Sequence, residues 1–163
     1  MVEGDRDPWT AHRAAHRWDI PARYNLAWDV CEKWARTDPD RLALIFLRPD
    51  GERRDYSFGQ LSRASARFAN ALAGHGVARG DRVGILLPQM PETIISHVAC
   101  YMLGAIAVPV FTLFGGEALA HRLGDAGVGT IVTDDANLAK VNALRGPSPG
   151  RSTEKTVLRA GND

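Results

Sequence analysis

Phe114, Gly115 and Gly116 form the most informative local pattern in the chain, because an apolar stretch runs into two glycines before a predicted helix start at Glu117. If the apolar stretch is a strand of a parallel sheet, the glycines lie at its carboxyl end, where open α/β sheets bind ligands. Glycines let a ligand approach the backbone, and free N–H groups at a helix start suit an anionic group. The alternative is a simple turn in which Glu117 satisfies the helix dipole. The pattern leaves both interpretations open.

Three pairs of side chains stand four residues apart, the spacing that places both members on one helix face. The pairs are His12 with His16, His97 with Tyr101, and His121 with Asp125. The histidine pair could hold a metal ion, but a zinc site needs further ligands and none is nearby, so a solvated pair is favoured. The other two pairs fit acid–base arrangements, yet packing is the default interpretation of an isolated pair.

Two further patterns have a chemical and a structural interpretation. Asp134 and Asp135 follow a predicted strand and could bind a cation, but they fit the cap of the next helix equally well, and capping is favoured. The glycines of residues 74–76 and Gly80 resemble part of a dinucleotide fingerprint. They precede a strand, however, whereas pyrophosphate binding needs glycines after the strand, so we interpret them as a helix end and a turn.

Motifs for several other chemistries are absent from the sequence. It contains no G-x-x-x-x-G-K-[ST] phosphate loop, no G-x-S-x-G nucleophile elbow and no H-E-x-x-H metal motif. Cys31 and Cys100 are the only cysteines, too few for a disulfide framework, and they form no C-x-x-C. Two reduced, buried thiols and the lack of a secretory signal in residues 1–23 predict a cytoplasmic location.

Length and composition indicate one globular domain: 163 residues, of which 45% are hydrophobic and 24% charged. Twenty basic against nineteen acidic residues leave a net charge of +1, which gives no general attraction to nucleic acid or to an anionic membrane. Residues 93–116 carry no charge and approach the length of a membrane span. Gly104 and Pro109 divide them, so a buried helix followed by a buried strand is predicted instead of a span.

The first elements follow a polar leader, residues 1–23. Asn25 is placed to cap an amphipathic helix, with apolar residues at 26, 27, 30, 31, 34 and 35. An antiparallel hairpin near residues 42–56 comes next, in which the apolar stretch 42–47 forms one strand and Pro-Asp-Gly at 49–51 the turn.

After the hairpin, helices and strands alternate. Ser57 and Gln60 have the spacing of a capping box, which begins a helix that ends near residues 74–76. The ranges predicted beyond it are strands at 82–87, 105–110 and 130–133 and helices at 91–103, 117–126 and 137–144. This alternation indicates an α/β fold with a mostly parallel βαβ sheet that helices cover on both faces. We divide the chain into the leader, an α/β subdomain at 24–145, and a breaker-rich connection with a terminal strand at 146–163.

Several motifs in the same order resemble the start of an AMP-forming acyl-CoA synthetase of the adenylate-forming superfamily, over about residues 24 to 160. The segments that carry the resemblance are Arg54 to Leu61, Arg67 to Leu72, Gly76 to Glu92, Gly104 to Val110 and Leu113 to Leu119. The resemblance implies an incomplete N-terminal subdomain of such an enzyme. Members of the family convert a carboxylic acid and ATP, with Mg²⁺, into an acyl-adenylate and pyrophosphate, and then transfer the acyl group to coenzyme A.

The family's phosphate loop, metal-binding acid and catalytic lysine follow the segment resembled here, so we expect no catalytic or metal-binding residue in this chain. The loop of Phe114, Gly115 and Gly116 is similar to one that lies near coenzyme A in some relatives. The resemblance implies the N-terminal part of a synthetase, inactive by itself, whose substrates are a carboxylic acid, ATP and CoA. The alternative is a non-catalytic docking module. The expected partners are the rest of the enzyme, or a second copy that associates through exposed surface.

Overall fold

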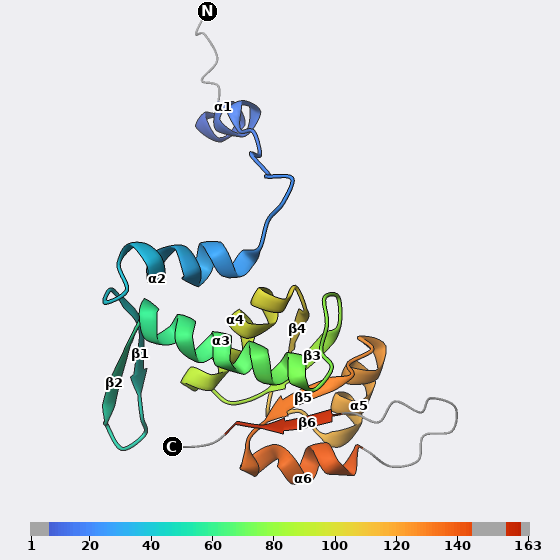
Figure 1. Cartoon of the computed structure of the whole chain (residues 1–163). Coiled ribbons are helices and arrows are strands. Elements are labelled where there is room, and N and C mark those ends of the chain that lie inside the picture. The colour runs from blue at the N-terminus through green and yellow to red at the C-terminus, as the bar shows by residue number, and fades with distance from the viewer. Residues whose placement is uncertain (1–6, 145–155, 161–163) are drawn as a thin grey trace, which may run out of the picture.

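The computed structural model describes residues 7–144 and 156–160 (Figure 1). It confirms the α/β class, with a four-stranded sheet in the order β4-β3-β5-β6 and a separate two-stranded sheet, β1-β2. The strands are β1 Leu42–Leu47, β2 Arg53–Ser57, β3 Arg82–Leu86, β4 Ile106–Pro109, β5 Thr130–Thr133 and β6 Thr156–Arg159. The helices are α1 Pro8–Ala15, the π-helix η1 Trp28–Glu32, α2 Lys33–Thr37, α3 Phe58–Gly74, α4 Pro91–Leu103, α5 Gly116–Asp125 and α6 Asp135–Ala143.

The larger sheet is parallel throughout, and β3 lies at its centre. Val83 of β3 pairs with Ala107 of β4 on one side and with Thr130 of β5 on the other. Strand β6 pairs with β5, from Thr130 opposite Thr156 onward, and so becomes an edge of this sheet. The breaker-rich connection at 146–150 and Lys155 lie outside the described residues.

Helices cover both faces of the parallel sheet, as its apolar strands predict. Ile85 of β3 and Val132 of β5 belong to one core cluster, together with residues of α3 and α4. The neighbouring Leu86 and Ile131 point the other way and pack with residues of α5 and α6. Figure 1 shows α3 and α4 on one side of the strands and α6 on the other. The sheet therefore holds the carboxyl ends of its strands fixed between two packed layers.

Local signals set the ends of two central helices. The hydroxyl of Ser57 accepts a hydrogen bond from the backbone N–H of Gln60, whose side chain accepts one from the backbone N–H of Ser57, which confirms the capping box. Helix α4 begins at Pro91 and ends at Leu103, followed by the cap residue Gly104, which has a left-handed φ of 69°. The uncharged stretch 93–116 is thus a helix followed by strand β4. Within residues 7–144 and 156–160, no helix is long and apolar enough to cross a membrane.

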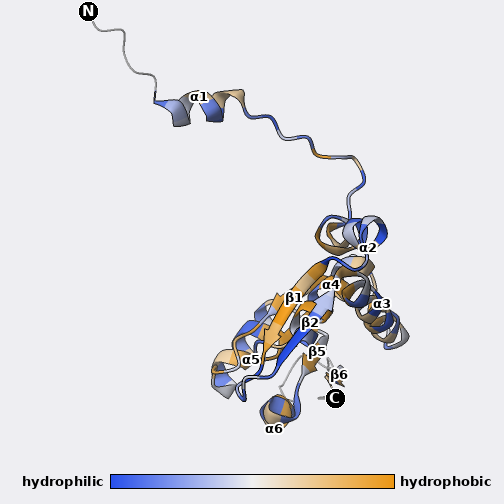
Figure 2. Cartoon of the chain, turned by 90° about the vertical axis from the view of Figure 1, so that its left-hand side faces the viewer, coloured by the Kyte–Doolittle hydropathy of each residue, from blue (hydrophilic) through white to orange (hydrophobic). Residues whose placement is uncertain are grey.

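The leader holds a helix that the sequence patterns did not predict. Asp7 accepts a hydrogen bond from the backbone N–H of Trp9 at 3.2 Å, and Pro8 occupies the first turn, so α1 is well capped. None of its residues is buried. Figures 1 and 2 both show α1 separated from the rest of the fold by an extended segment.

The helix after Asn25 differs in part from its prediction. The Asn25 side chain caps it as predicted, accepting a hydrogen bond from the backbone N–H of Ala27 at 2.8 Å. Its middle, however, is the wider π-helical turn η1. Ala27 is buried, whereas Leu26 and Val30 are 40% and 42% exposed. Only part of the predicted apolar face therefore contacts the core.

Candidate functional site

The candidate loop, residues 110–115, connects the carboxyl end of β4 to the start of α5. Its first residue, Val110, extends the sheet pairing by donating a backbone hydrogen bond to the carbonyl of Ile85 at 3.0 Å. A tight turn follows, in which the backbone N–H of Phe114 donates to the carbonyl of Phe111 at 3.1 Å. Gly115 is the extended cap residue of α5. The two glycines thus lie at the carboxyl side of the parallel sheet, the side at which open α/β folds bind ligands.

Neither glycine is required by the backbone of this turn. Gly115 has φ −69° and ψ 166°, values open to any residue, and Gly116 is the first residue of α5. A Cβ atom added at either position would meet no other atom within 4 Å. The space beside Gly115 and Gly116 is therefore open, and an approaching group can reach the backbone there.

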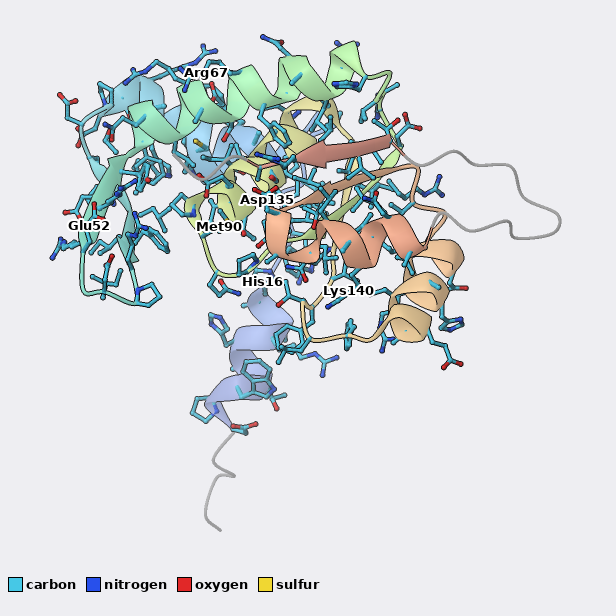
Figure 3. The ribbon with its side chains drawn as sticks, turned by 90° about the horizontal axis from the view of Figure 1, so that it is seen from below. His16, Glu52, Arg67, Met90, Asp135 and Lys140 are labelled. Carbon is cyan, nitrogen blue, oxygen red and sulfur yellow. The ribbon has the colours of Figure 1, made fainter. Side chains whose placement is uncertain are left out.

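Lys140 of α6 holds the loop from the side. Its Nζ donates a hydrogen bond to the backbone carbonyl of Thr112 at 2.6 Å. Figure 3 labels Lys140 on this helix. The sequence patterns missed Lys140, because it stands 28 residues from Thr112 and carries no local motif. The one feature of the sequence that pointed to Lys140 was its place on a predicted helix that follows a parallel strand.

Phe114 anchors the loop to α5, while its neighbours stay exposed. The Arg122 guanidinium carbon lies 4.2 Å from the centre of the Phe114 ring, and the Phe111 ring meets the same ring edge to face at 5.8 Å. Phe114 also packs against the core cluster on the α5 side of the sheet. Phe111 and Leu113 are 59% and 79% exposed. Of the three predicted site residues, Phe114 therefore fixes the loop, and the two glycines provide open backbone.

The side-chain pairs predicted from helical spacing do not gather at this loop. His97 Nδ1 lies 3.2 Å from the Tyr101 hydroxyl within α4, and burial lowers the pKa of His97. Tyr101 packs beside the core cluster that includes Cys31, which confirms the packing interpretation of this pair. The remaining members of the pairs, His12, His16, His121 and Asp125, are all exposed.

The acidic pair after β5 caps a helix, as favoured from the sequence. The Asp134 carboxylate accepts hydrogen bonds from the backbone N–H of Asn137 at 3.0 Å and from its side-chain amide at 2.7 Å. Asp135 forms an ion pair with Arg159 at 2.9 Å. In the part of the chain that the structure describes, no group of three or more His, Cys, Asp or Glu residues could hold a metal ion.

The glycines at 74–80 form a helix end and a turn, which confirms their structural interpretation. Helix α3 ends at Gly74, and Gly76 and Gly80 have positive φ angles of 85° and 86°. A hollow of about 230 Å³ lies beside this turn, at the amino ends of β3 and β5, and His75, Asp81 and Arg82 are among its lining residues. This edge is opposite to the one that carries the candidate loop.

The parallel sheet and its carboxyl-edge loop define an open α/β scaffold, a class of fold that binds ligands at the carboxyl ends of its strands. The chain belongs to the AMP-binding enzyme family, whose model matches residues 31–162. It corresponds to the N-terminal portion of an adenylate-forming acyl-CoA synthetase, which confirms the resemblance predicted from its motifs.

Among curated relatives, the acetyl-coenzyme A synthetase of Penicillium chrysogenum is 34% identical over 141 residues, which are 83% of this chain and 21% of the relative. The acetyl-coenzyme A synthetase of Streptomyces coelicolor is 33% identical over 148 residues, 89% of this chain and 22% of the relative. The chain thus spans about a fifth of the length of these relatives.

Solved structures share the fold. An acyl-CoA synthetase from Brucella canis superposes with a TM-score of 0.74 at 27% identity, and the match covers 97% of this chain and 28% of that one. The N-terminal domain of FACL13 from Mycobacterium tuberculosis superposes with a TM-score of 0.73 at 24% identity, over 85% of this chain and 34% of that domain. The arrangement of helices around the parallel sheet is therefore that of synthetase N-terminal domains.

Proposed function

We propose that the chain acts as the N-terminal part of an enzyme that joins a carboxylic acid to coenzyme A by way of an acyl-adenylate. In this reaction a carboxylate oxygen attacks the α-phosphate of ATP and pyrophosphate leaves; the CoA thiol then attacks the acyl carbon and AMP leaves. The observation that carries the proposal is the family match over residues 31–162, which includes the whole parallel sheet and its carboxyl-edge loop.

In this proposal the chain supplies a scaffold, and the groups that bind ATP and Mg²⁺ come from the rest of a synthetase. The region at 24–145 provides the helices and strands, and the strand within 146–163 adds an edge to the sheet. The leader, 1–23, contributes no buried side chain among its described residues. We place the protein in the cytoplasm, a location supported by two unpaired, buried cysteines, Cys31 and Cys100.

An exchange assay tests this function. Residues 1–163 replace the region that they match in the Streptomyces coelicolor relative, and the resulting chimera is compared with the isolated chain and with the intact relative. We expect acetate-dependent exchange of pyrophosphate into ATP by the chimera and the relative, and none by the isolated chain. Exchange by the isolated chain, or a folded chimera without exchange, would overturn the proposal.

We further propose that Phe114, Gly115 and Gly116 form a loop close to bound CoA. The open space beside both glycines and the exposed carboxyl-edge position support this role. In the chimera, Gly115→Ala and Gly116→Ala are expected to raise the KM for CoA about tenfold, which corresponds to about 1.4 kcal/mol of lost contact. Pyrophosphate exchange, which needs no CoA, stays unchanged.

Gly124→Ala is the matched control for these substitutions. Gly124 also lies on α5, and a Cβ there likewise meets nothing within 4 Å. This control leaves both exchange and the KM for CoA at the values of the unsubstituted chimera. If the KM for CoA is the same in all the variants, the proposal that this loop lies close to bound CoA is wrong.

The second candidate, a non-catalytic docking module, is favoured by the exposed apolar side chains of strand β1. It predicts a chimera that folds and yet fails to exchange pyrophosphate. The same assay therefore separates the two candidates.

A further inference from the structure

Strand β1 is apolar from end to end, yet much of it is exposed. Its sequence is Leu-Ala-Leu-Ile-Phe-Leu, and Leu42, Ile45 and Leu47 are 48%, 46% and 66% exposed. We call these three side chains the β1 patch. In Figure 2 the strand is drawn in orange, the hydrophobic end of the scale. Within the described residues, β1 pairs with β2 alone.

The partner strand has the composition that water-facing strands normally have. Arg53 and Asp55 of β2 form an ion pair at 2.7 Å, and Arg54 pairs with Glu52 at 2.7 Å. Strand β1 carries no charge, and continuous apolar strands are typical of sheets covered on both faces. An uncovered apolar edge invites association, and a two-stranded hairpin alone is marginally stable. The β1 patch therefore has the chemistry of a buried surface.

No residue of β1 is fully buried: Ala43, Leu44 and Phe46 are half-buried, and the three patch residues are exposed. Ala43 packs beside the core cluster formed by η1, α3 and α4. The register of β1 with β2 shifts between Leu42 and Leu44; beyond this shift Ile45 and Leu47 lie on one face of the hairpin, opposite Asp55 and Arg53. Apolar side chains of β1 thus extend past Ala43, the residue through which the strand packs beside this core cluster.

The family range and the length of the relatives support one occupant for this face. The hairpin lies inside residues 31–162, which the family shares, so it is not an addition peculiar to this chain. The relatives have about five times the length of the matched region. We propose that the β1 patch is the surface against which the rest of a synthetase polypeptide docks, an inference that rests on the proposed function.

Cysteine labelling tests the proposal directly. Ile45→Cys and Leu47→Cys are made in the isolated chain and in the chimera, and each is treated with a maleimide. The native Cys31 and Cys100 are 0% exposed, and burial raises the pKa of each thiol to about 11, so they give little background. Ile20→Cys is the matched control, because Ile20 is 73% exposed and precedes the family match.

We expect labelling at positions 45 and 47 to be at least about tenfold slower in the chimera than in the isolated chain, whereas position 20 reacts equally in both. Equal rates at 45 and 47 in a chimera that exchanges pyrophosphate would overturn the docking surface and leave the proposed function standing. A folded chimera without exchange overturns the proposed function instead. A dimer of the isolated chain in which the same positions are protected would assign the patch to self-association.

A second measurement keeps the proposal testable if the chimera does not fold. The chain is co-expressed with the tagged remainder of the Streptomyces coelicolor relative, and its capture on the tag is measured. Ile45→Thr and Leu47→Thr keep a strand-forming residue but remove apolar area, and each is expected to weaken capture about tenfold or more. Ile20→Thr, the control, is captured as well as the wild type. Failure to capture the wild-type chain, or equal capture of all variants, overturns the proposal.

Discussion

Lys140 Nζ donates a 2.6 Å hydrogen bond to the backbone carbonyl of Thr112, which ties helix α6 to the loop that ends at Gly115. This contact joins two segments that follow different strands of the parallel sheet. It therefore couples the position of the loop to the packing of α6 against the sheet.

Removing this contact should loosen the loop. We expect Lys140→Met to lower the free energy of unfolding by about 1–2 kcal/mol, because the bond comes from a charged donor in a half-buried setting. Hydrogen exchange of the amides at 111–116 should become faster, as mass spectrometry can follow. Asn142→Met, an exposed change on the same helix, is the control. Unchanged loop exchange in Lys140→Met would show that the contact does not restrain the loop.

Arg122 and Phe114 should be energetically coupled across their 4.2 Å contact. A double-mutant cycle of Arg122→Met and Phe114→Leu, followed by urea unfolding, is expected to give a coupling energy of about 0.5–1 kcal/mol. The parallel cycle with Phe111→Leu should give less, because Phe111 contacts the Phe114 ring instead of the guanidinium. Equal coupling in both cycles would contradict the cation–π contact.

Two glycines that flank the same core should respond in opposite ways to alanine. A Cβ at Gly84 of β3 would lie 3.0 Å from Leu123 and 3.1 Å from Val128, so Gly84→Ala is expected to destabilise the chain by about 1–3 kcal/mol. Gly124→Ala meets no atom within 4 Å and should stabilise it by about 0.5–1 kcal/mol. Thermal unfolding of the two variants measures both effects. If both substitutions shift the melting temperature in the same direction, the packing argument is wrong.

The stability of the fold should decrease as the pH falls through the range of histidine titration. Burial lowers the pKa of His97 below its ordinary value of 6.5, so the unfolded chain binds this proton more readily than the folded chain. The contribution is complete above pH 6.5 and is lost as the pH falls toward the lowered pKa. Urea unfolding between pH 7.5 and about 5 should show a smaller decrease for His97→Gln than for the wild type. If the free energy of unfolding falls equally with pH in His97→Gln and in the wild type, His97 does not contribute to this pH dependence.

The two thiols should be inert in the folded protein. Burial raises the pKa of Cys31 and of Cys100 to about 11, so almost no thiolate is present near pH 8, and both side chains are inaccessible. We expect a thiol reagent to modify neither residue in native buffer and both in guanidinium. Rapid modification of one equivalent under native conditions would show that a core helix opens locally.

The site was predictable in outline and not in detail. The apolar run before Gly115 and Gly116 predicted a strand, a glycine loop and a helix start, and the structure has β4, the loop and α5 in that order. The anchors Lys140 and Arg122 carry no sequence motif, because a contact with a carbonyl or a ring depends on how two elements pack. The role of the loop at CoA stays a prediction.

Local sequence determined where most elements begin and end. Helix α4 at Pro91–Leu103 and strand β5 at Thr130–Thr133 match their predicted ranges, because proline, glycine and apolar runs act over a few residues. Tertiary structure alone decided the order β4-β3-β5-β6, the π-helical turn η1 and the exposure of β1. Each of these depends on which distant surfaces are available for packing, and local periodicity does not encode that choice.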